Sequence, residues 1–360
     1  MANDKQNTSP NVPNKGNVPR LRFPEFTEEW NFKTLDTLAP NISAGKDYAN
    51  EGNYKLYGST GVIGTTDKPS YKGEILLVAR VGANAGYLQY VNGEFGVTDN
   101  TLVVNAHDNN RYIYYYLQHY NLNRLVFGSG QPLITGGMLK KVPIGISNDC
   151  AEKNKIVKLL SLLDARIATQ NKIIEQLQSL IKGIRVRLFS FDNYDIKYLG
   201  DLCSITTGKL DANAMVENGK YPFFTCAEDT FRIDEYAFDT EALLISGNGA
   251  NLGYIHYYKG KFNAYQRTYV LDKFSVEVMY LKYYLETFLN QRINQEVNVG
   301  NTPYIVLSTL TKMKIKIPDI SQQRNIINVL SNLNLKLNQE KDILSAYQTQ
   351  KAYLLRNLFI

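Results

Sequence analysis

The chain of 360 residues is 44% hydrophobic and 21% charged, which is typical of a soluble globular protein with two or three domains. Its longest apolar runs fall far short of the ~18 residues that a membrane-spanning helix needs, and its polar N-terminus lacks the apolar centre of a signal peptide. Because the three cysteines form no CxxC pair and the three histidines are scattered, the sequence argues against a disulfide scaffold, a zinc module and His-based catalysis, and it fits a reducing cytoplasm.

The formal net charge of +6 comes mostly from two short segments. Residues 151–189 carry 8 Lys and Arg against 3 Asp and Glu, and residues 321–360 carry 5 against 2. The two long segments, 20–147 and 190–320, have net charges of +1 and −3. A modest positive balance suggests nucleic acid without proving it. A nucleic-acid interface would therefore depend on local patches or on the short segments, whose charge is equally consistent with a solvated helix face.

In chain order, residues 1–18 are polar and are expected to be a disordered tail. Residues 19–149 are expected to form a first globular domain that is rich in strands. Its aliphatic and β-branched runs at 74–81 and 102–104 are bounded by Gly and Asn, which predicts strands. Residues 112–120 predict a short helix.

Residues 190–319 are expected to form a second domain of the same kind, because motifs of the first domain return in it. Gly82–Tyr87 returns as Gly249–Tyr254, and the same offset of 167 relates Thr101 to Thr268. The chain therefore contains two copies of a unit of about 170 residues. Strands and a helix are predicted at the equivalent places of the second copy, at 242–245, 254–258, 269–271 and 279–289.

Two long helices are predicted at 150–189 and 320–360, each after a Lys-aliphatic-Pro motif, Lys141–Pro143 in the first copy and Lys316–Pro318 in the second. Apolar residues recur at alternating spacings of four and three, which is typical of the a/d seam of a left-handed coiled coil. The preceding prolines, and Gly183 near the end of the first helix, fit the usual punctuation of helices. The predicted seam residues are Ile156, Leu160, Leu163, Ile167, Gln170, Ile174 and Leu177 in the first helix, and Ile326, Leu330, Leu333, Leu337, Glu340 and Leu344 in the second.

Gln170 and Glu340 occupy equivalent polar positions in the two seams. A polar residue at one seam position can fix register and orientation at some cost in stability. If the two helices pack antiparallel, the middles of the two segments meet and these side chains face each other. A seam that frays at this point is equally consistent with the sequence.

Motifs of common nucleotide-dependent and DNA-modifying enzymes are absent from the sequence. There is no GxxxxGK[ST] loop and no Asn/Asp-Pro-Pro-aromatic motif of base-amino methyltransferases. Gly247-Asn248-Gly249 resembles part of a dinucleotide-binding loop, but the strand-like Tyr254–Tyr258 follows where that motif requires a helix. The isolated Asp195-Ile196-Lys197 lacks the acidic partner of a nuclease site and is interpreted as a surface turn.

What remains is a set of glycine-rich loops whose side chains suit binding. Asn and Gln can bond bidentately to adenine, and Arg to guanine, in the major groove of DNA. The structural alternative is that Asn and Gly serve turns and that Tyr fills half-buried strand faces. Duplication of the loops on two domains favours binding. The candidate contact residues are Ser59, Thr60, Arg80, Asn84, Thr98, Asn100, Gln131, Thr225, Asn248, Asn251, Gln266, Arg267 and Asn301.

This arrangement resembles the specificity (S) subunits of type I restriction–modification systems, over almost the whole chain from about Pro19 to Phe359. In the second helix, Asn334 replaces the acidic side chain that Asp164 supplies in the first. The stretches that carry the resemblance are Val18–Phe26 with Trp30, Arg80–Gly86, Ser246–Gly253, Glu152–Ile167 and Gln322–Leu333.

The resemblance implies an α+β fold with two strand-rich target-recognition domains, separated by two long helices that pack as an antiparallel coiled coil with a pseudo-twofold internal repeat. Each domain would read one half of a split site in double-stranded DNA, and the helices would set the unread gap and dock two methylation (M) subunits. S-adenosylmethionine, ATP and Mg²⁺ would be bound by the methylation and restriction (R) subunits. This chain itself would bind no metal or cofactor and catalyse nothing.

Two other interpretations remain open at this point. A stand-alone β-rich nuclease or methyltransferase would cleave DNA or transfer methyl groups without partner subunits. A coiled-coil scaffold that only binds proteins would show no sequence preference in a filter-binding assay, even with methylation subunits present.

Overall fold

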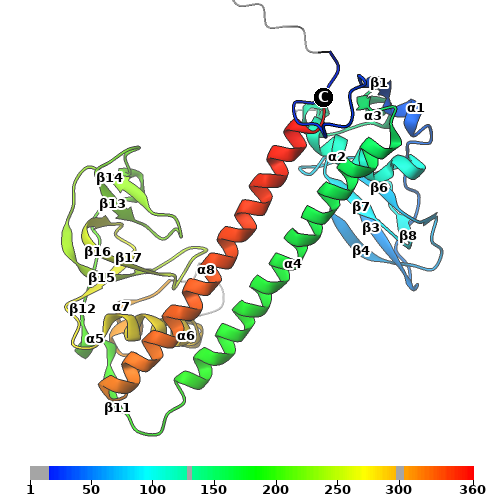
Figure 1. Cartoon of the computed structure of the whole chain (residues 1–360). Coiled ribbons are helices and arrows are strands. Elements are labelled where there is room, and N and C mark those ends of the chain that lie inside the picture. Colours follow the sequence, from blue (N-terminus) through cyan, green and yellow to red (C-terminus); the bar gives the residue numbers. More distant parts are fainter. Residues whose placement is uncertain (1–15, 128–131, 297–303) are drawn as a thin grey trace, which may run out of the picture. The chain divides into compact units, whose positions relative to one another are not determined.

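The computed structural model describes residues 16–127, 132–296 and 304–360. These residues form two compact units: the first contains the chain up to Asn171 together with Asp342–Ile360, and the second contains Lys172–Lys341. Each unit combines one strand-rich domain with part of each of two long helices (Figure 1), which confirms the predicted α+β class. The division between the units passes through both long helices, which are α4 (Cys150–Leu188) and α8 (Ile320–Asn357).

The strand-rich domain of the first unit contains two four-stranded sheets and a two-stranded ribbon. The sheets have the strand orders β2-β9-β6-β7 and β4-β3-β8-β5, and β1 pairs with β10. The strands are β1 (Asn31–Thr34), β2 (Ser43–Ala44), β3 (Tyr54–Gly58), β4 (Gly61–Thr66), β5 (Tyr71–Lys72), β6 (Ile75–Ala79), β7 (Leu88–Val91), β8 (Glu94–Val97), β9 (Thr101–Val104) and β10 (Pro143–Ile146). The short helices include α1 (Leu35–Leu38), α2 (Asn110–Tyr120) and α3 (Gly136–Lys140).

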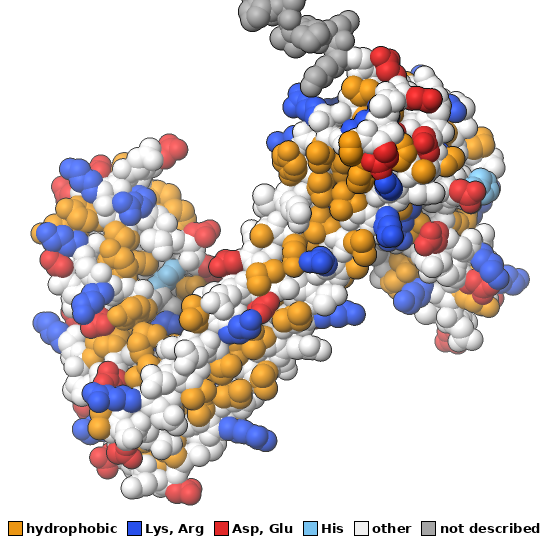
Figure 2. All heavy atoms as spheres, viewed as in Figure 1, with side chains coloured by type: hydrophobic (Ala, Val, Ile, Leu, Met, Phe, Trp, Pro, Cys, Tyr) orange, Lys and Arg blue, Asp and Glu red, His pale blue; other side chains and the backbone are white. Residues whose placement is uncertain are grey.

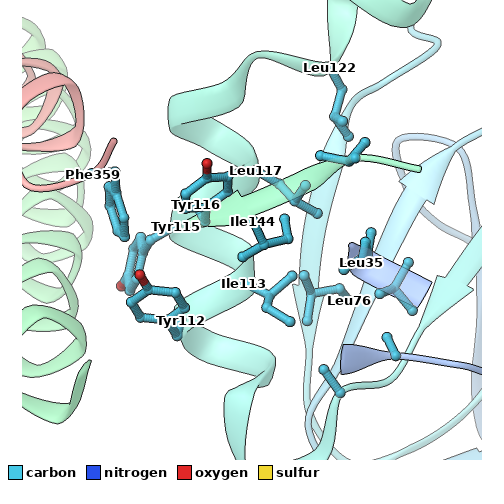
Figure 3. Close-up of a cluster of buried hydrophobic side chains, with 14 of the residues drawn as sticks. Leu35, Leu76, Tyr112, Ile113, Tyr115, Tyr116, Leu117, Leu122, Ile144 and Phe359 are labelled. Carbon is cyan, nitrogen blue, oxygen red and sulfur yellow. The ribbon is translucent and has the colours of Figure 1, made fainter. Parts of the chain in front are cut away.

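The core of the first unit is organised around α2, which buries side chains on two sides. Tyr112 and Tyr116 pack edge-on against Phe359, at the end of the chain, with ring centroids 5.5 and 5.6 Å apart. On the other side of α2, Ile113 points toward Leu76 of the sheet (Figure 3). The helix therefore joins the sheet to the long helices through one continuous apolar cluster.

The strand-rich domain of the second unit contains a six-stranded sheet and a two-stranded ribbon. The sheet has the order β12-β17-β15-β16-β13-β14, and β11 pairs with β18. The strands are β11 (Asp195–Tyr198), β12 (Ser204–Thr207), β13 (Tyr221–Phe224), β14 (Phe231–Ile233), β15 (Phe238–Ser246), β16 (Ile255–Ala264), β17 (Thr268–Asp272) and β18 (Lys314–Ile317), and the helices include α5 (Leu199–Leu202), α6 (Val278–Glu296) and α7 (Leu307–Thr311). Asp195-Ile196-Lys197, interpreted from sequence as a surface turn, forms strand β11, because its backbone pairs with β18.

The internal repeat extends to the packing of the two cores. Phe189, just after α4, packs against Tyr280 and Tyr284 of α6 with ring centroids 5.8 and 5.3 Å apart. Phe359, just after α8, makes the same contacts with the equivalent tyrosines of α2. Each strand-rich domain is thus closed by an aromatic ring from the end of one long helix.

The match of Lys141–Pro143 with Lys316–Pro318 predicted from sequence is wrong. The Tyr112 hydroxyl donates to the carbonyl of Gly145 at 2.7 Å, and the equivalent Tyr280 donates to that of Lys316 at 2.5 Å. Gly145 and Lys316 therefore correspond, and Pro143 corresponds to Lys314, since each begins the strand that pairs with β1 or β11. Pro143 consequently lies in a strand, and only Pro318 directly precedes a long helix.

The predicted seam lies on the inner side of both long helices. Every seam residue named above is buried or half-buried; Leu160, Ile326 and Leu330 are 0% exposed, and the polar Glu340 is 8% exposed. α4 continues past Gly183 to Leu188, next to the end predicted at residue 189. Gln170 is buried as well, and its pairing with Glu340 stays a prediction.

Within the first unit, α4 and α8 run antiparallel. Asp164 pairs with Lys351 at 2.6 Å, and the Arg166 guanidinium lies 6.0 Å from the ring centre of Tyr347. An increase in residue number along one helix is thus matched by a decrease along the other. None of the helices in the described part of the chain has the apolar stretch that crossing a membrane would require.

The segment before β1 is fixed to the start of α4. Arg22 donates from Nε to Glu152 Oε1 at 2.6 Å, and Trp30 donates from Nε1 to Glu152 Oε2 at 3.0 Å. The backbone N–H of Trp30 also donates to the carbonyl of Asn17 at 2.7 Å. The expected disordered tail therefore does not reach residue 18, and its residues 1–15 lie outside the described part.

Candidate functional site

Three loops of the first unit lie at one edge of its sheets. Because β3 and β8 are parallel and Tyr57 is in register with Val97, the loops after these strands lie side by side. Since β6 is antiparallel to β9, with Ala79 opposite Thr101, the loop after β6 lies at the same edge. Candidate residues on these loops are therefore brought together, namely Ser59, Thr60, Arg80, Asn84, Thr98 and Asn100.

The second unit has the same arrangement, set by the same strand pairings. Phe224 at the end of β13 is in register with Ala264 at the end of β16, in parallel, and Ser246 at the end of β15 lies opposite Thr268 at the start of β17. This edge, which we call the loop edge in both units, carries the candidates Thr225, Asn248, Asn251, Gln266 and Arg267.

Hydrogen bonds fix a three-residue turn at the loop edge of the first unit, Thr98–Asn100. The carbonyl of Asn100 accepts from the backbone N–H of Arg80 at 2.9 Å and from Ser59 Oγ at 3.1 Å. The N–H of Thr98 donates to the carbonyl of Tyr57 at 3.0 Å. The turn is therefore anchored to both neighbouring loops.

The equivalent turn of the second unit, Tyr265–Arg267, has the same bonds. The carbonyl of Arg267 accepts from the N–H of Gly247 at 2.9 Å and from Cys226 Sγ at 3.4 Å. The N–H of Tyr265 donates to the carbonyl of Phe224 at 2.9 Å. One backbone frame thus holds two different sets of side chains.

The glycine-rich loops of the repeat also share a backbone conformation. Gly82 and Gly86 have φ of +84° and +91°, and the equivalent Gly249 and Gly253 have +80° and +82°. A residue with a Cβ is strained at such angles. This requirement explains why both glycines of the GANxGY pattern return in the second copy.

Two side chains that sequence reasoning missed hold the first loop of each edge. Gln89 Nε2 donates to the carbonyls of Gly58 and Ser59 at 2.9 and 3.1 Å. The equivalent His256 places Nε2 2.9 Å from the carbonyl of Ala227. Burial lowers the pKa of His256, so the neutral ring donates through its Nε2–H at pH 7. The constant offset of 167 relates the two residues, but their side chains share only the capacity to donate.

The candidates differ in how free their side chains are. Thr225 is buried, and its hydroxyl accepts from the N–H of Ala227 at 3.2 Å, so it shapes the loop. Asn251 donates to the carbonyl of Cys226 at 3.2 Å. Asn84, by contrast, is exposed. Gln131 and Asn301 lie outside the described residues.

Arg267 borders a cleft of about 250 Å³ in the second unit. Its guanidinium is exposed and makes no hydrogen bond or ion pair with the described residues. The cleft is lined by Thr207, Gly247, Gln266, Arg267, Tyr269 and Ile305. Thr207 and Gln266, like Arg267, have side chains that make no hydrogen bond with the described residues, whereas the Tyr269 hydroxyl donates to the carbonyl of Ile305 at 2.8 Å.

The charge on the visible face is mixed. Lys and Arg side chains lie among Asp and Glu side chains over both strand-rich domains (Figure 2). Across residues 16–127, 132–296 and 304–360, no group of three or more His, Cys, Asp or Glu side chains is placed to hold a metal ion. On this face, neither strand-rich domain therefore presents a continuous positive surface.

Comparison with known proteins identifies the family. The model of the type I restriction modification DNA specificity domain matches twice, over residues 27–179 and 192–345. The chain therefore belongs to this family and contains two copies of its domain, as the resemblance in sequence predicted.

The relatives include specificity subunits of type I restriction enzymes. The EcoDI specificity subunit of Escherichia coli is 40% identical over 143 residues, which cover 40% of this chain and about a third (32%) of that subunit. The putative specificity subunit S.HindORF215P of Haemophilus influenzae is 24% identical over 90% of this chain and 93% of its own. The crystal structure of the S subunit from M. genitalium has the same fold, with a TM-score of 0.68 and 22% identity over 95% of this chain and 99% of that chain.

Proposed function

We propose that this chain is the specificity subunit of a type I restriction–modification complex and that each loop edge reads one half of a bipartite DNA site. The observation that carries the proposal is that two equivalent edges share one hydrogen-bonded backbone and differ in their exposed side chains. Base edges in the major groove are read by such polar side chains, whereas phosphate contacts position the protein. Two different sets of side chains should read two different half-sites.

The partners follow from the same proposal. Two methylation subunits dock on the helices and carry S-adenosylmethionine and the chemistry, and restriction subunits add ATP- and Mg²⁺-dependent cleavage. This chain binds the DNA and catalyses nothing, and it acts in the cytoplasm. Exposed apolar side chains on the long helices support docking, because Leu162, Leu180 and Leu335 are 58%, 55% and 58% exposed and such groups favour protein contacts.

Methylome sequencing tests the proposal. In cells that express the chain with its methylation subunits, methylated adenines or cytosines should fall within an asymmetric sequence of two parts separated by a gap of fixed length. The same cells without this chain serve as the control and should lose that methylation. A single continuous palindrome would contradict the bipartite site, and methyl transfer or cleavage by the purified chain alone would favour an enzyme instead.

A further inference from the structure

The turn between β8 and β9 in the first unit, and between β16 and β17 in the second, has the same hydrogen-bonded backbone but different side chains. The sequence is Thr98-Asp99-Asn100 in the first unit and Tyr265-Gln266-Arg267 in the second. Its third residue accepts two hydrogen bonds through its carbonyl in both units. The same hydrogen bonds therefore hold the backbone of the third residue in both units.

The third side chain of each turn is free to bind. Asn100 and Arg267 are exposed, and neither side chain hydrogen-bonds or forms an ion pair with the described residues. Asp99 and Gln266, the second residues, are exposed as well. Each turn thus presents two exposed side chains to a ligand at the loop edge.

Glycines of neighbouring segments pack closely against the backbone at or next to each turn. A Cβ on Gly247 would lie 2.4 Å from the carbonyl oxygen of Arg267, and one on Gly208 would lie 1.9 Å from that of Ala264. In the first unit, a Cβ on Gly45 would lie 2.1 Å from the carbonyl oxygen of Val97. A side chain at any of these glycines would therefore displace the backbone that carries the turn.

We infer that the third residue of this turn determines one base of each half-site, with Arg267 reading guanine and Asn100 reading adenine. This inference rests on the proposed function. A guanidinium matches the O6 and N7 acceptors of guanine bidentately, and a carboxamide matches N6 and N7 of adenine. A backbone held by hydrogen bonds favours such directional pairing, because mainly the side chain must then be ordered on binding. The cleft beside Arg267 leaves room for the edge of a base.

The test replaces Arg267 with Gln in the complete complex, with methylated sites mapped by methylome sequencing. One position of one half-site should lose its guanine preference by about tenfold or more and accept adenine, because Gln pairs with adenine and one bidentate contact accounts for discrimination of about this size. Asn100→Arg should change adenine to guanine at one position of the other half-site. Lys259→Gln, an exposed change on the same domain, is the control and should leave the sequence unchanged.

Two results would overturn the inference. The recognised sequence could stay the same while Arg267→Gln weakens binding to every sequence and lowers the salt slope by about one, which is the mark of a phosphate contact. Alternatively, both variants could leave the sequence and the level of methylation unchanged.

A second pair of variants tests the inference with substitutions that should not disturb folding. Arg267→Ala and Asn100→Ala shorten exposed side chains and should relax the same single positions, with thermal midpoints close to that of the unaltered chain. If these variants fold and the motif is intact, the inference is wrong. Failure of the proposed function itself is distinguishable, because then the unaltered complex directs no methylation to a defined bipartite sequence.

Discussion

At the scale of single residues, Glu152 shows how one carboxylate joins distant parts of a chain. It is completely buried and lies in the first turn of α4, where a negative charge is favoured by the helix dipole. Burial opposes its ionisation, but the hydrogen bonds from Arg22, Ser147 and Trp30, together with the charge of Arg22, outweigh burial and lower its pKa. The second copy has Gln322 at the equivalent position, so this ionic contact belongs to the first unit alone.

Glu152→Gln should lower the free energy of unfolding by about 2 kcal/mol at pH 7, because hydrogen bonds to a charged group are lost. The pKa of Glu152 is lower in the folded than in the unfolded chain, so the ionised group stabilises the fold above its unfolded pKa of about 4.5. That contribution is lost as the pH falls through the folded value. Thermal melts should therefore show a gap between the two proteins at pH 7 that narrows below about pH 4.5.

Glu25→Gln provides the matched control for this measurement. Glu25 pairs with Lys155 at the surface, and exposed pairs contribute little because water and salt screen them. Its substitution should leave the melting temperature nearly unchanged at every pH. Equal losses for both variants would show that the contact of Arg22 with α4 has no special role.

At the scale of elements, the heptad seam decides which side of each long helix is buried. Leu163 is 6% exposed and belongs to the core of the first unit, whereas its neighbour Leu162 is 58% exposed. Adjacent helical residues point about 100° apart. The position in the heptad therefore decides which of these two adjacent leucines is buried, although their composition and helix propensity are the same.

Leu163→Asp should destabilise the chain by at least about 3 kcal/mol, because it removes a buried apolar side chain and buries an unpaired charge. Leu162→Asp should change stability by no more than about 0.5 kcal/mol, as most exposed substitutions do. Chemical denaturation of both variants measures the difference. Similar stabilities would mean that the seam does not pack as the heptads indicate.

At the scale of the whole molecule, the two helices connect the units as continuous chain segments. Both α4 and α8 pass from one unit to the other without interruption. Under the proposed function, the length of these helices sets the gap between the two half-sites. Gly183 offers a place for insertion, because no described atom outside its two chain neighbours and the nearby helix backbone lies within 4 Å of the position a Cβ would take.

Insertion of seven residues between Lys182 and Gly183 should change the length of the gap and leave both half-site sequences unchanged. Seven helical residues add roughly 10 Å, about the length of three base pairs, and keep the heptad phase. Methylome sequencing of the complete complex measures the gap. The same insertion in the exposed loop between Asp234 and Glu235 is the control, and an altered half-site sequence would contradict the role of the helix as a spacer.

Much of the fold and part of the candidate site could be predicted from sequence. The long helices follow from heptad spacing, which is a local signal, and the duplication follows from glycines that only one backbone conformation suits, such as Gly82 and Gly249. The loop candidates followed from residue type, but nothing local distinguished the free Arg267 from the buried Thr225. Burial depends on neighbours that are distant in the chain.

The amino-acid sequence by itself determined the repeat, the two helices and the family, because spacing and identical motifs survive without any knowledge of contacts. Tertiary structure alone decided which loops share an edge, since parallel and antiparallel strand pairing brings together residues far apart in sequence. It also corrected the match of Pro143, because strand pairing and the Tyr112 hydrogen bond outweigh a three-residue similarity. Long-range hydrogen bonds, which no periodicity records, gave Gln89 and His256 their common role.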